Sequence, residues 1–168
     1  GWIYRGHRVV NWCPTCASTV SDLEVEHLTH SGHFWHIKYP LVGEEGFVIV
    51  ATTRPETMLG DTAVAVNSQD PRHQCLHGKR VLLPLMEREI PIITDDLLVD
   101  PEFGTGAVKV TPAHDLNDFE AGQRNQLPAV VVIGTDGRMT EEAKQYAGLD
   151  RYDARKRVLE DLKTQGLL

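Results

Sequence analysis

The sequence predicts an α+β protein that is mainly β, in which short strands form a barrel-like curved sheet with a few flanking helices. Two observations lead to this fold class. Short apolar, β-branched runs recur between Gly, Pro and Asp turns, and only three stretches carry helix signals. We expect one domain over residues 1–168, because this is an ordinary domain length and no internal repeat divides the chain.

The strands are expected after an N-terminal connecting segment, residues 1–33, which is polar, rich in His and predicted to be irregular. Residues 47–52 form a continuous β-branched run, which is typical of a strand buried on both faces. The complete set of expected strands is 34–39, 47–52, 62–66, 80–83, 90–93, 107–111 and 129–133.

Helix signals follow two of these strands and also close the chain. Thr53 and Glu56 have the spacing of a capping box, which predicts a short helix with Thr53 as its N-cap. Asp115 opens a second helix in the same way, and this helix should end before Pro128. The third helix, 150–165, has apolar residues at every fourth position and a glycine stop (Ala154, Val158, Leu162 and Gly166).

Composition and charge exclude several classes of function. Hydrophobic residues make up 41% of the chain and charged residues 24%, which is typical of a globular protein. The net charge of −7 argues against a protein that coats nucleic-acid phosphates, so we expect no DNA partner. A few local cations suffice for contact with a single-stranded RNA end. No apolar run approaches 18 residues, so no membrane partner is expected.

The cysteines and the first residue indicate the setting. Three cysteines, an odd number, fit a reduced intracellular compartment, which we take to be the cytoplasm with an organelle as the alternative. The chain starts at Gly1 rather than Met, which predicts a piece of a longer protein.

Two segments carry the residues suited to chemistry. In 51–61, a buried strand brings threonines and one arginine to the start of a helix, where free N–H groups suit anionic or carbonyl ligands. In 102–120, strand periodicity places Lys109 and Thr111 on one face. Asp115 and Asp118 then share one side of a first helical turn. Taken singly, each aspartate is better explained by a structural role, Asp115 as an N-cap and Asp118 as a first-turn charge that suits the helix dipole.

Taken together, the sequences of these two segments are similar to those of a known family. The runs are T-T-R-P-E-T-M-L-G-D-T-A-V-A-V at 52–66 and G-T-G-A-V-K-V-T-P-A-H-D-L-N-D-F-E at 104–120, preceded by V-N-W at 10–12 and S-D-L-E-V-E at 21–26. They resemble the editing domain inserted into valyl-tRNA synthetase, a class I aminoacyl-tRNA synthetase, over essentially the whole chain. Leucyl and isoleucyl relatives, the alternative assignment, typically carry Met or His in place of Lys109.

The resemblance implies a task and a substrate. An apolar pocket rejects an isostere with one added hydroxyl by only about a hundredfold, and valine against threonine in this enzyme family is the standard example. A second, polar site must therefore hydrolyse threonine wrongly esterified to the valine tRNA. The nucleotide-binding motifs of the synthetase are absent. The expected activity is thus aminoacyl-tRNA ester hydrolysis, with the 3′ CCA end of the threonine-bearing tRNA and the remainder of the synthetase as partners.

The resemblance also implies roles for individual residues. Asp118 matches the carboxylate that binds the substrate ammonium, and Arg54 the contact to the terminal adenosine and its phosphate. Phe103 matches an aromatic wall for the terminal adenine, and Glu120 a contact to the ribose. The threonine hydroxyl is expected to be surrounded by Lys109, Thr111 and Asp115. The positions that line the pocket and hold a water molecule are Thr52, Thr53 and Thr57.

The reaction itself needs no nucleophilic side chain, because an aminoacyl ester is already activated toward water. We expect a positioned water assisted by hydroxyls, backbone N–H groups and the substrate's ribose hydroxyl. Asp115 is an alternative general base, although a carboxylate beside Lys109 should stay a weak base. His114, in a turn after Pro112, fits a structural hydrogen bond better than catalysis.

Two other functions remain open at this point. Cys13, Cys16, His30 and His36 fall within the generic spacing of a Cys₂His₂ zinc site, and the cysteine pair alone would make half a zinc knuckle. No cofactor is expected for the hydrolysis, and zinc at Cys13 and Cys16 is the weaker hypothesis. The other alternative is a non-catalytic module that positions the tRNA 3′ end.

Overall fold

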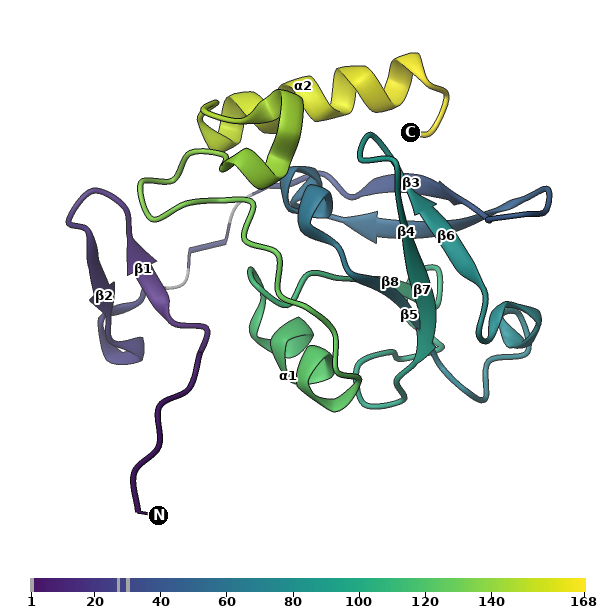
Figure 1. Cartoon of the computed structure of the whole chain (residues 1–168), viewed down its shortest axis with the longest axis horizontal. Coiled ribbons are helices and arrows are strands. Elements are labelled where there is room, and N and C mark those ends of the chain that lie inside the picture. The colour runs from purple at the N-terminus through teal and green to yellow at the C-terminus, as the bar shows by residue number, and fades with distance from the viewer. Residues whose placement is uncertain (1, 27, 30) are drawn as a thin grey trace.

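The computed structural model describes residues 2–26, 28–29 and 31–168 (Figure 1). The strands of this part of the chain are β1 (Asn11–Cys13), β2 (Ser18–Val20), β3 (Trp35–Pro40), β4 (Phe47–Thr52), β5 (Ala63–Val66), β6 (Arg80–Leu83), β7 (Arg88–Thr94) and β8 (Ala107–Val110). The α-helices are α1 (Leu116–Arg124) and α2 (Arg151–Thr164). Short 3₁₀ helices are η1 (Asp22–Glu24), η2 (Pro55–Gly60), η3 (Gln74–Leu76) and η4 (Glu141–Tyr146).

The strands form three hydrogen-bonded sheets. The largest has the order β6-β7-β5-β8, in which β5 and β7 are parallel and the other pairs antiparallel. The β3–β4 hairpin joins β6 through a bridge between Leu41 and Val81, and β4 lies beside β8. The mainly β prediction is confirmed. Across the described residues the ladders do not close into a barrel, so the barrel-like shape stays a prediction.

The N-terminal segment is more ordered than the sequence suggested. Residues 1–33 were expected to be irregular, which is wrong for 11–24, where β1 and β2 form a hairpin that is followed by η1. The hairpin lies at one side of the molecule (Figure 1), and the Trp12 Nε1–H group donates to the carbonyl of Thr135 at 2.7 Å. Strands of three residues are too short to show alternation in the sequence.

Most of the expected strands are present, with two corrections. Residues 47–52 form β4, but alternate residues are buried, so this strand is buried on one face and not on both. The strand buried on both faces is β5. Residues 129–133 form no regular strand, since the N–H groups of Val132 and Ile133 point to the imidazole of His114 instead of a neighbouring strand.

The two α-helices agree with the sequence, whereas the capping box does not form and the short 3₁₀ helices η1, η3 and η4 were not expected. Thr53 is not an N-cap: η2 begins at Pro55 after Arg54, and no side chain caps it. Glu56 is turned away to Arg155 instead. Helix α1 is capped by Asp115 and ends before Pro128, and α2 buries the predicted stripe of Ala154, Val158 and Leu162. Among the described residues, none of the helices combines the length and the apolar composition of a membrane-spanning segment.

Candidate functional site

The two segments singled out in the sequence meet at one cavity of about 320 Å³. The end of β4 and the start of η2 supply one wall, and the end of β8 with the first turn of α1 supplies the other. The adjacent packing of β4 and β8 brings these walls together. All but two of the predicted site residues line this cavity: Thr52, Thr53, Arg54, Thr57, Lys109, Thr111, Asp115 and Asp118.

A buried ion pair forms the floor of the site. The ammonium of Lys109 lies 3.2 Å from Asp61 Oδ1 and also donates to the hydroxyl of Thr111. The Thr111 hydroxyl in turn donates to Asp61 Oδ1 at 2.5 Å. Lys109 and Thr111 therefore share a strand face as predicted, and they present one cation and one hydroxyl to the cavity.

Asp118 is buried at the cavity wall and is not an exposed first-turn charge. It is 7% exposed, and its Oδ2 accepts the backbone N–H of Thr111 at 2.8 Å. Burial raises the pKa of Asp118 to about 6, although the nearby Lys109 ammonium lowers it. Among the described residues no donor reaches Asp118 Oδ1, so this oxygen is free to accept from a ligand in the cavity.

Asp115 has the structural role that the sequence left open. Its Oδ1 accepts the backbone N–H groups of Asn117 and Asp118 at 2.9 and 3.2 Å, as expected of an N-cap. It lines the same cavity. One aspartate thus orients the first turn of α1, while the other, Asp118, has an oxygen available to a ligand.

His114 makes the structural hydrogen bonds that its position predicted. Its Nε2 accepts the backbone N–H of Val132 at 2.9 Å and that of Ile133 at 3.3 Å. Burial lowers the pKa of His114 to about 4, and the positive charges of Arg54 and Lys109 add to this effect. The imidazole is therefore neutral near pH 7, and its acceptor nitrogen is occupied by two backbone donors.

The wall formed by β4 and η2 holds its hydroxyls through the local backbone. The Thr52 hydroxyl accepts the backbone N–H of Arg54 at 3.0 Å, and the Thr57 hydroxyl donates to the Arg54 carbonyl at 2.9 Å. The side chain of Arg54 is 47% exposed and donates to the carbonyl of His114 at 3.1 Å. The guanidinium thus connects the two walls at the solvent side.

Two predicted residues lie elsewhere. Neither Phe103 nor Glu120 lines the cavity, and both side chains are exposed. Sequence reasoning also missed residues that do line it, among them Phe34, Leu98 and Asn117. Asn117 lies inside the 104–120 motif, which was the available signal, whereas Phe34 and Leu98 come from segments without one.

Cys13 is the last residue of β1 and Cys16 lies in the turn that leads to β2, and neither lines this cavity. Cys13 Sγ accepts the backbone N–H of Cys16 at 3.4 Å, and this backbone donor lowers the pKa of the Cys13 thiol. Across the described residues no three His, Cys, Asp or Glu side chains form a group able to hold a metal ion. His30 of the suggested Cys₂His₂ set lies outside the described residues. Zinc binding at Cys13 and Cys16 stays a hypothesis.

Comparison with known proteins identifies similar sequences over the whole chain. A family model described as leucyl-tRNA synthetase, editing domain, matches residues 70–156, just over half of the chain. The valine–tRNA ligase of Solibacter usitatus is 64% identical over all of this chain and 20% of the ligase. That of Clostridium tetani is 56% identical over all of this chain and 19% of the ligase. The chain therefore spans about a fifth of the length of these relatives.

Solved structures similar to this chain have the same fold at low sequence identity. A leucyl-tRNA synthetase from Agrobacterium radiobacter K84, in a ternary complex with tRNA, has a TM-score of 0.62 at 22% identity over 77% of this chain and 18% of that one. The structure of GlLeuRS-CP1 has a TM-score of 0.61 at 14% identity over 80% of this chain and 96% of that one. These likenesses concern the fold alone.

Proposed function

This chain belongs to the leucyl-tRNA synthetase editing-domain family, and from that premise we propose that it hydrolyses threonine wrongly esterified to the valine tRNA. The valyl branch is favoured by the whole-chain identity of 64% to a valine–tRNA ligase and by Lys109 followed by Thr111. The observation that carries the proposal is the cavity that Lys109, Thr111 and Asp118 line together.

The polarity of the cavity suits threonine better than valine. Valine and threonine differ by a methyl in place of a hydroxyl, and a site built to hydrogen-bond a hydroxyl rejects the analogue that lacks it far more strongly than shape does. Lys109 is a donor and the Thr111 hydroxyl an acceptor on the same wall. A bound valine would leave one N–H donor of Lys109 and one lone pair of the Thr111 hydroxyl desolvated and without a partner, which is unfavourable.

The charged groups divide the rest of the substrate between them. The free Oδ1 of Asp118 suits the α-ammonium of the amino acid, and a bound cation would favour the ionised carboxylate whose pKa burial raises to about 6. Arg54, at the exposed rim, suits the phosphate and adenosine of the tRNA end. Phe103 and Glu120 stay proposed contacts to the nucleotides, outside the amino-acid cavity.

We propose that a water molecule attacks the ester carbonyl directly. The water oxygen bonds to the carbonyl carbon, the bond to the ribose oxygen breaks, and a proton passes to that oxygen, which releases threonine and an uncharged tRNA. No Ser or Cys lines the cavity in the described chain, and the Nε2 of His114 is occupied. Positioning by Thr52, Thr53 and backbone N–H groups is therefore the proposed source of catalysis, without a cofactor.

The partners follow from the same reading. We propose that the chain acts on the 3′ CCA end of the valine tRNA and works beside the remaining four fifths of a valine–tRNA ligase. The likeness to the tRNA-bound leucyl enzyme supports only the fold of this chain, because the sequence identity is low. A ligase of this kind would act in the cytoplasm, where tRNA is charged, or in an organelle that does the same.

The test uses a chimeric ligase, in which this chain replaces the matching fifth of the Solibacter usitatus enzyme. We expect the chimeric ligase to hydrolyse threonyl-tRNA(Val) about 10⁴-fold faster than valyl-tRNA(Val), since only threonine satisfies Lys109 and Thr111. The measurement is single-turnover release of labelled amino acid from each ester. The Asp118→Ala variant of the chimeric ligase serves as the inactive control.

Each other outcome points to a different error. Equal rates for the two esters would mean that the cavity does not read the hydroxyl. Binding of the tRNA end without hydrolysis of either ester would identify a non-catalytic positioning module. Preference for an ester on the isoleucine or leucine tRNA would assign the chain to another branch of the family.

A further inference from the structure

Asp61 is a buried carboxylate beneath the cavity to which sequence reasoning assigned no role. It is completely buried, does not line the cavity, and lies just after η2. Three side chains donate to it: Tyr39 to Oδ2 at 2.7 Å, and Lys109 and Thr111 to Oδ1 at 3.2 and 2.5 Å. Two of these donors, Lys109 and Thr111, line the cavity.

The three contacts fix the direction of every hydrogen bond in the floor of the site. Asp61 is the counter-ion of Lys109, and an ionised carboxylate only accepts, so the Thr111 hydroxyl uses its proton on Asp61. That hydroxyl also accepts from Lys109, which leaves it one lone pair. Lys109 has three N–H donors, of which Asp61 and Thr111 take two. Within the described chain the floor therefore offers one acceptor, on Thr111, and one donor, on Lys109.

This pair of vacancies matches one chemical group. An aliphatic hydroxyl donates once and accepts, so it can donate to Thr111 and accept from Lys109 at the same time. A methyl group can do neither. Without the carboxylate, the Thr111 hydroxyl would be free to rotate and donate to the substrate, and the Lys109 ammonium would lose its buried counter-ion.

We propose that Asp61 is the positioning residue that gives the editing site its specificity for a hydroxyl. Asp61 fixes Thr111 as an acceptor and Lys109 as a donor, and the Tyr39 hydroxyl holds Asp61 in place through a hydrogen bond. Asp61 acts through these two side chains and does not touch the substrate. The inference rests on the proposed function and names the source of its threonine preference.

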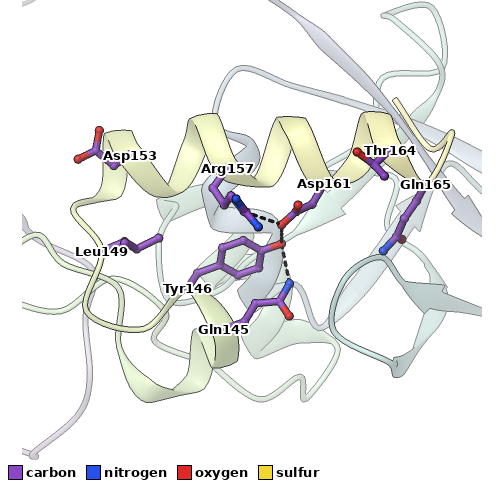
Figure 2. Close-up of a pocket in the computed structure, with 8 residues that line it drawn as sticks. All are labelled: Gln145, Tyr146, Leu149, Asp153, Arg157, Asp161, Thr164 and Gln165. Atoms are coloured by element: carbon purple, nitrogen blue, oxygen red, sulfur yellow. Dashed lines mark hydrogen bonds and ion pairs between the residues drawn. The ribbon is translucent and has the colours of Figure 1, made fainter.

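Tyr39 has a close counterpart elsewhere that provides a matched control. The hydroxyl of Tyr146, in η4, donates to Asp161 Oδ2 of α2 at 2.8 Å and accepts from Gln145 at 2.9 Å. Figure 2 shows this pair in a different cavity, between η4 and α2, with Arg157 next to Asp161. Both tyrosines are almost completely buried, so removal of either hydroxyl disturbs a similar Tyr–Asp contact.

The experiment measures kcat and KM of the chimeric ligase for threonyl-tRNA(Val) and valyl-tRNA(Val). For Asp61→Asn, which keeps the size but removes the charge, we expect kcat/KM for the threonyl ester to fall about tenfold to a hundredfold. The kcat/KM for the valyl ester should change less than about threefold, because valine makes no hydrogen bond to Thr111 or Lys109. Tyr39→Phe should lower the ratio of the two esters by a smaller factor, and Tyr146→Phe should leave the ratio unchanged.

The outcomes separate specificity from stability. Melting temperatures of all variants are measured alongside, and Tyr39→Phe and Tyr146→Phe are expected to lose similar stability. A folded Asp61→Asn variant that keeps the wild-type ratio would overturn the inference, as would an equal loss of ratio in Tyr146→Phe. If Asp61→Asn does not fold, the Tyr39→Phe variant is the test. An unchanged ratio of the two esters in Tyr39→Phe would then overturn the inference. A wild-type chimeric ligase that hydrolyses neither ester would refute the proposed function instead.

Discussion

The carboxylate of Asp118 accepts the backbone N–H of Thr111 at 2.8 Å, which joins the first turn of α1 to the end of β8. This one bond sets the distance between the wall that carries the proposed ammonium ligand and the wall that carries Lys109 and Thr111. It also holds a carboxylate in a buried position where its ionisation is unfavourable, since burial raises its pKa to about 6. A site built in this way exchanges stability for function.

Asp118→Asn is expected to abolish deacylation and to stabilise the fold at pH 7. The asparagine oxygen can still accept the Thr111 N–H, but the buried charge is gone. A rise in pKa from 3.8 to about 6 corresponds to roughly 2–3 kcal/mol at neutral pH, so we expect a gain on the order of 1–3 kcal/mol in the free energy of unfolding. Urea unfolding at pH 7 measures it, and a clear loss of stability would contradict this account.

His114 and Asp118 should have opposite effects on the pH dependence of stability. The raised pKa of Asp118 gives stability that is present below about pH 4 and lost as the pH rises through about 6. The lowered pKa of His114 gives stability that is present above pH 6.5 and lost as the pH falls toward about 4. In the wild-type chain the two slopes largely cancel between pH 4 and 6.

The same Asp118→Asn variant reveals that cancellation. In this variant His114 still titrates and position 118 does not. The stability of the variant should therefore fall more steeply than that of the wild type as the pH is lowered from 6.5 to 4. Unfolding by urea at half-unit pH steps gives both profiles, and parallel profiles would show that one of the two pKa shifts is misassigned.

Arg54→Ala is expected to weaken binding of a CCA-ended acceptor stem without changing the preference for threonine. Arg54 lies at the exposed rim, whereas the amino-acid groups lie on the floor. With a net charge of −7 the chain attracts RNA only through local cations, so the salt dependence of affinity should correspond to about one to three phosphates. Affinity and both ester rates are measured at two salt concentrations. A collapse of the threonine preference with intact affinity would place Arg54 in the amino-acid pocket.

Arg155→Ala is expected to destabilise the fold by about 3–5 kcal/mol. Glu56 is 1% exposed, and Arg155 holds its two carboxylate oxygens at 2.7 and 2.8 Å, so the variant leaves this buried charge with only the Arg54 guanidinium at 4.0 Å. Lys156→Ala is the matched control, because its pair with Asp153 is exposed and should contribute less than about 0.5 kcal/mol. Thermal unfolding compares them, and equal losses would mean that the buried pair has no special weight.

The sequence by itself determined the parts of this protein that depend on neighbours along the chain. The position of β4, the N-cap at Asp115, the buried stripe of α2 and the shared face of Lys109 and Thr111 all follow from spacings of a few residues. Local periodicity is enough for these features, because the backbone geometry of a strand or helix fixes where each side chain points.

Only the tertiary structure decided the features whose partners lie far apart in the sequence. Glu56 forms an ion pair with Arg155, 99 residues away, instead of the predicted capping box, because a bidentate ion pair is stronger than a capping hydrogen bond. Residues 129–133 have strand-like composition, but two of their N–H groups bond to His114. Asp61 meets Lys109 and Thr111 across 48 and 50 residues. The pattern of residues adjacent in the sequence does not predict such contacts, because burial and pairing depend on which surfaces pack together in the folded chain.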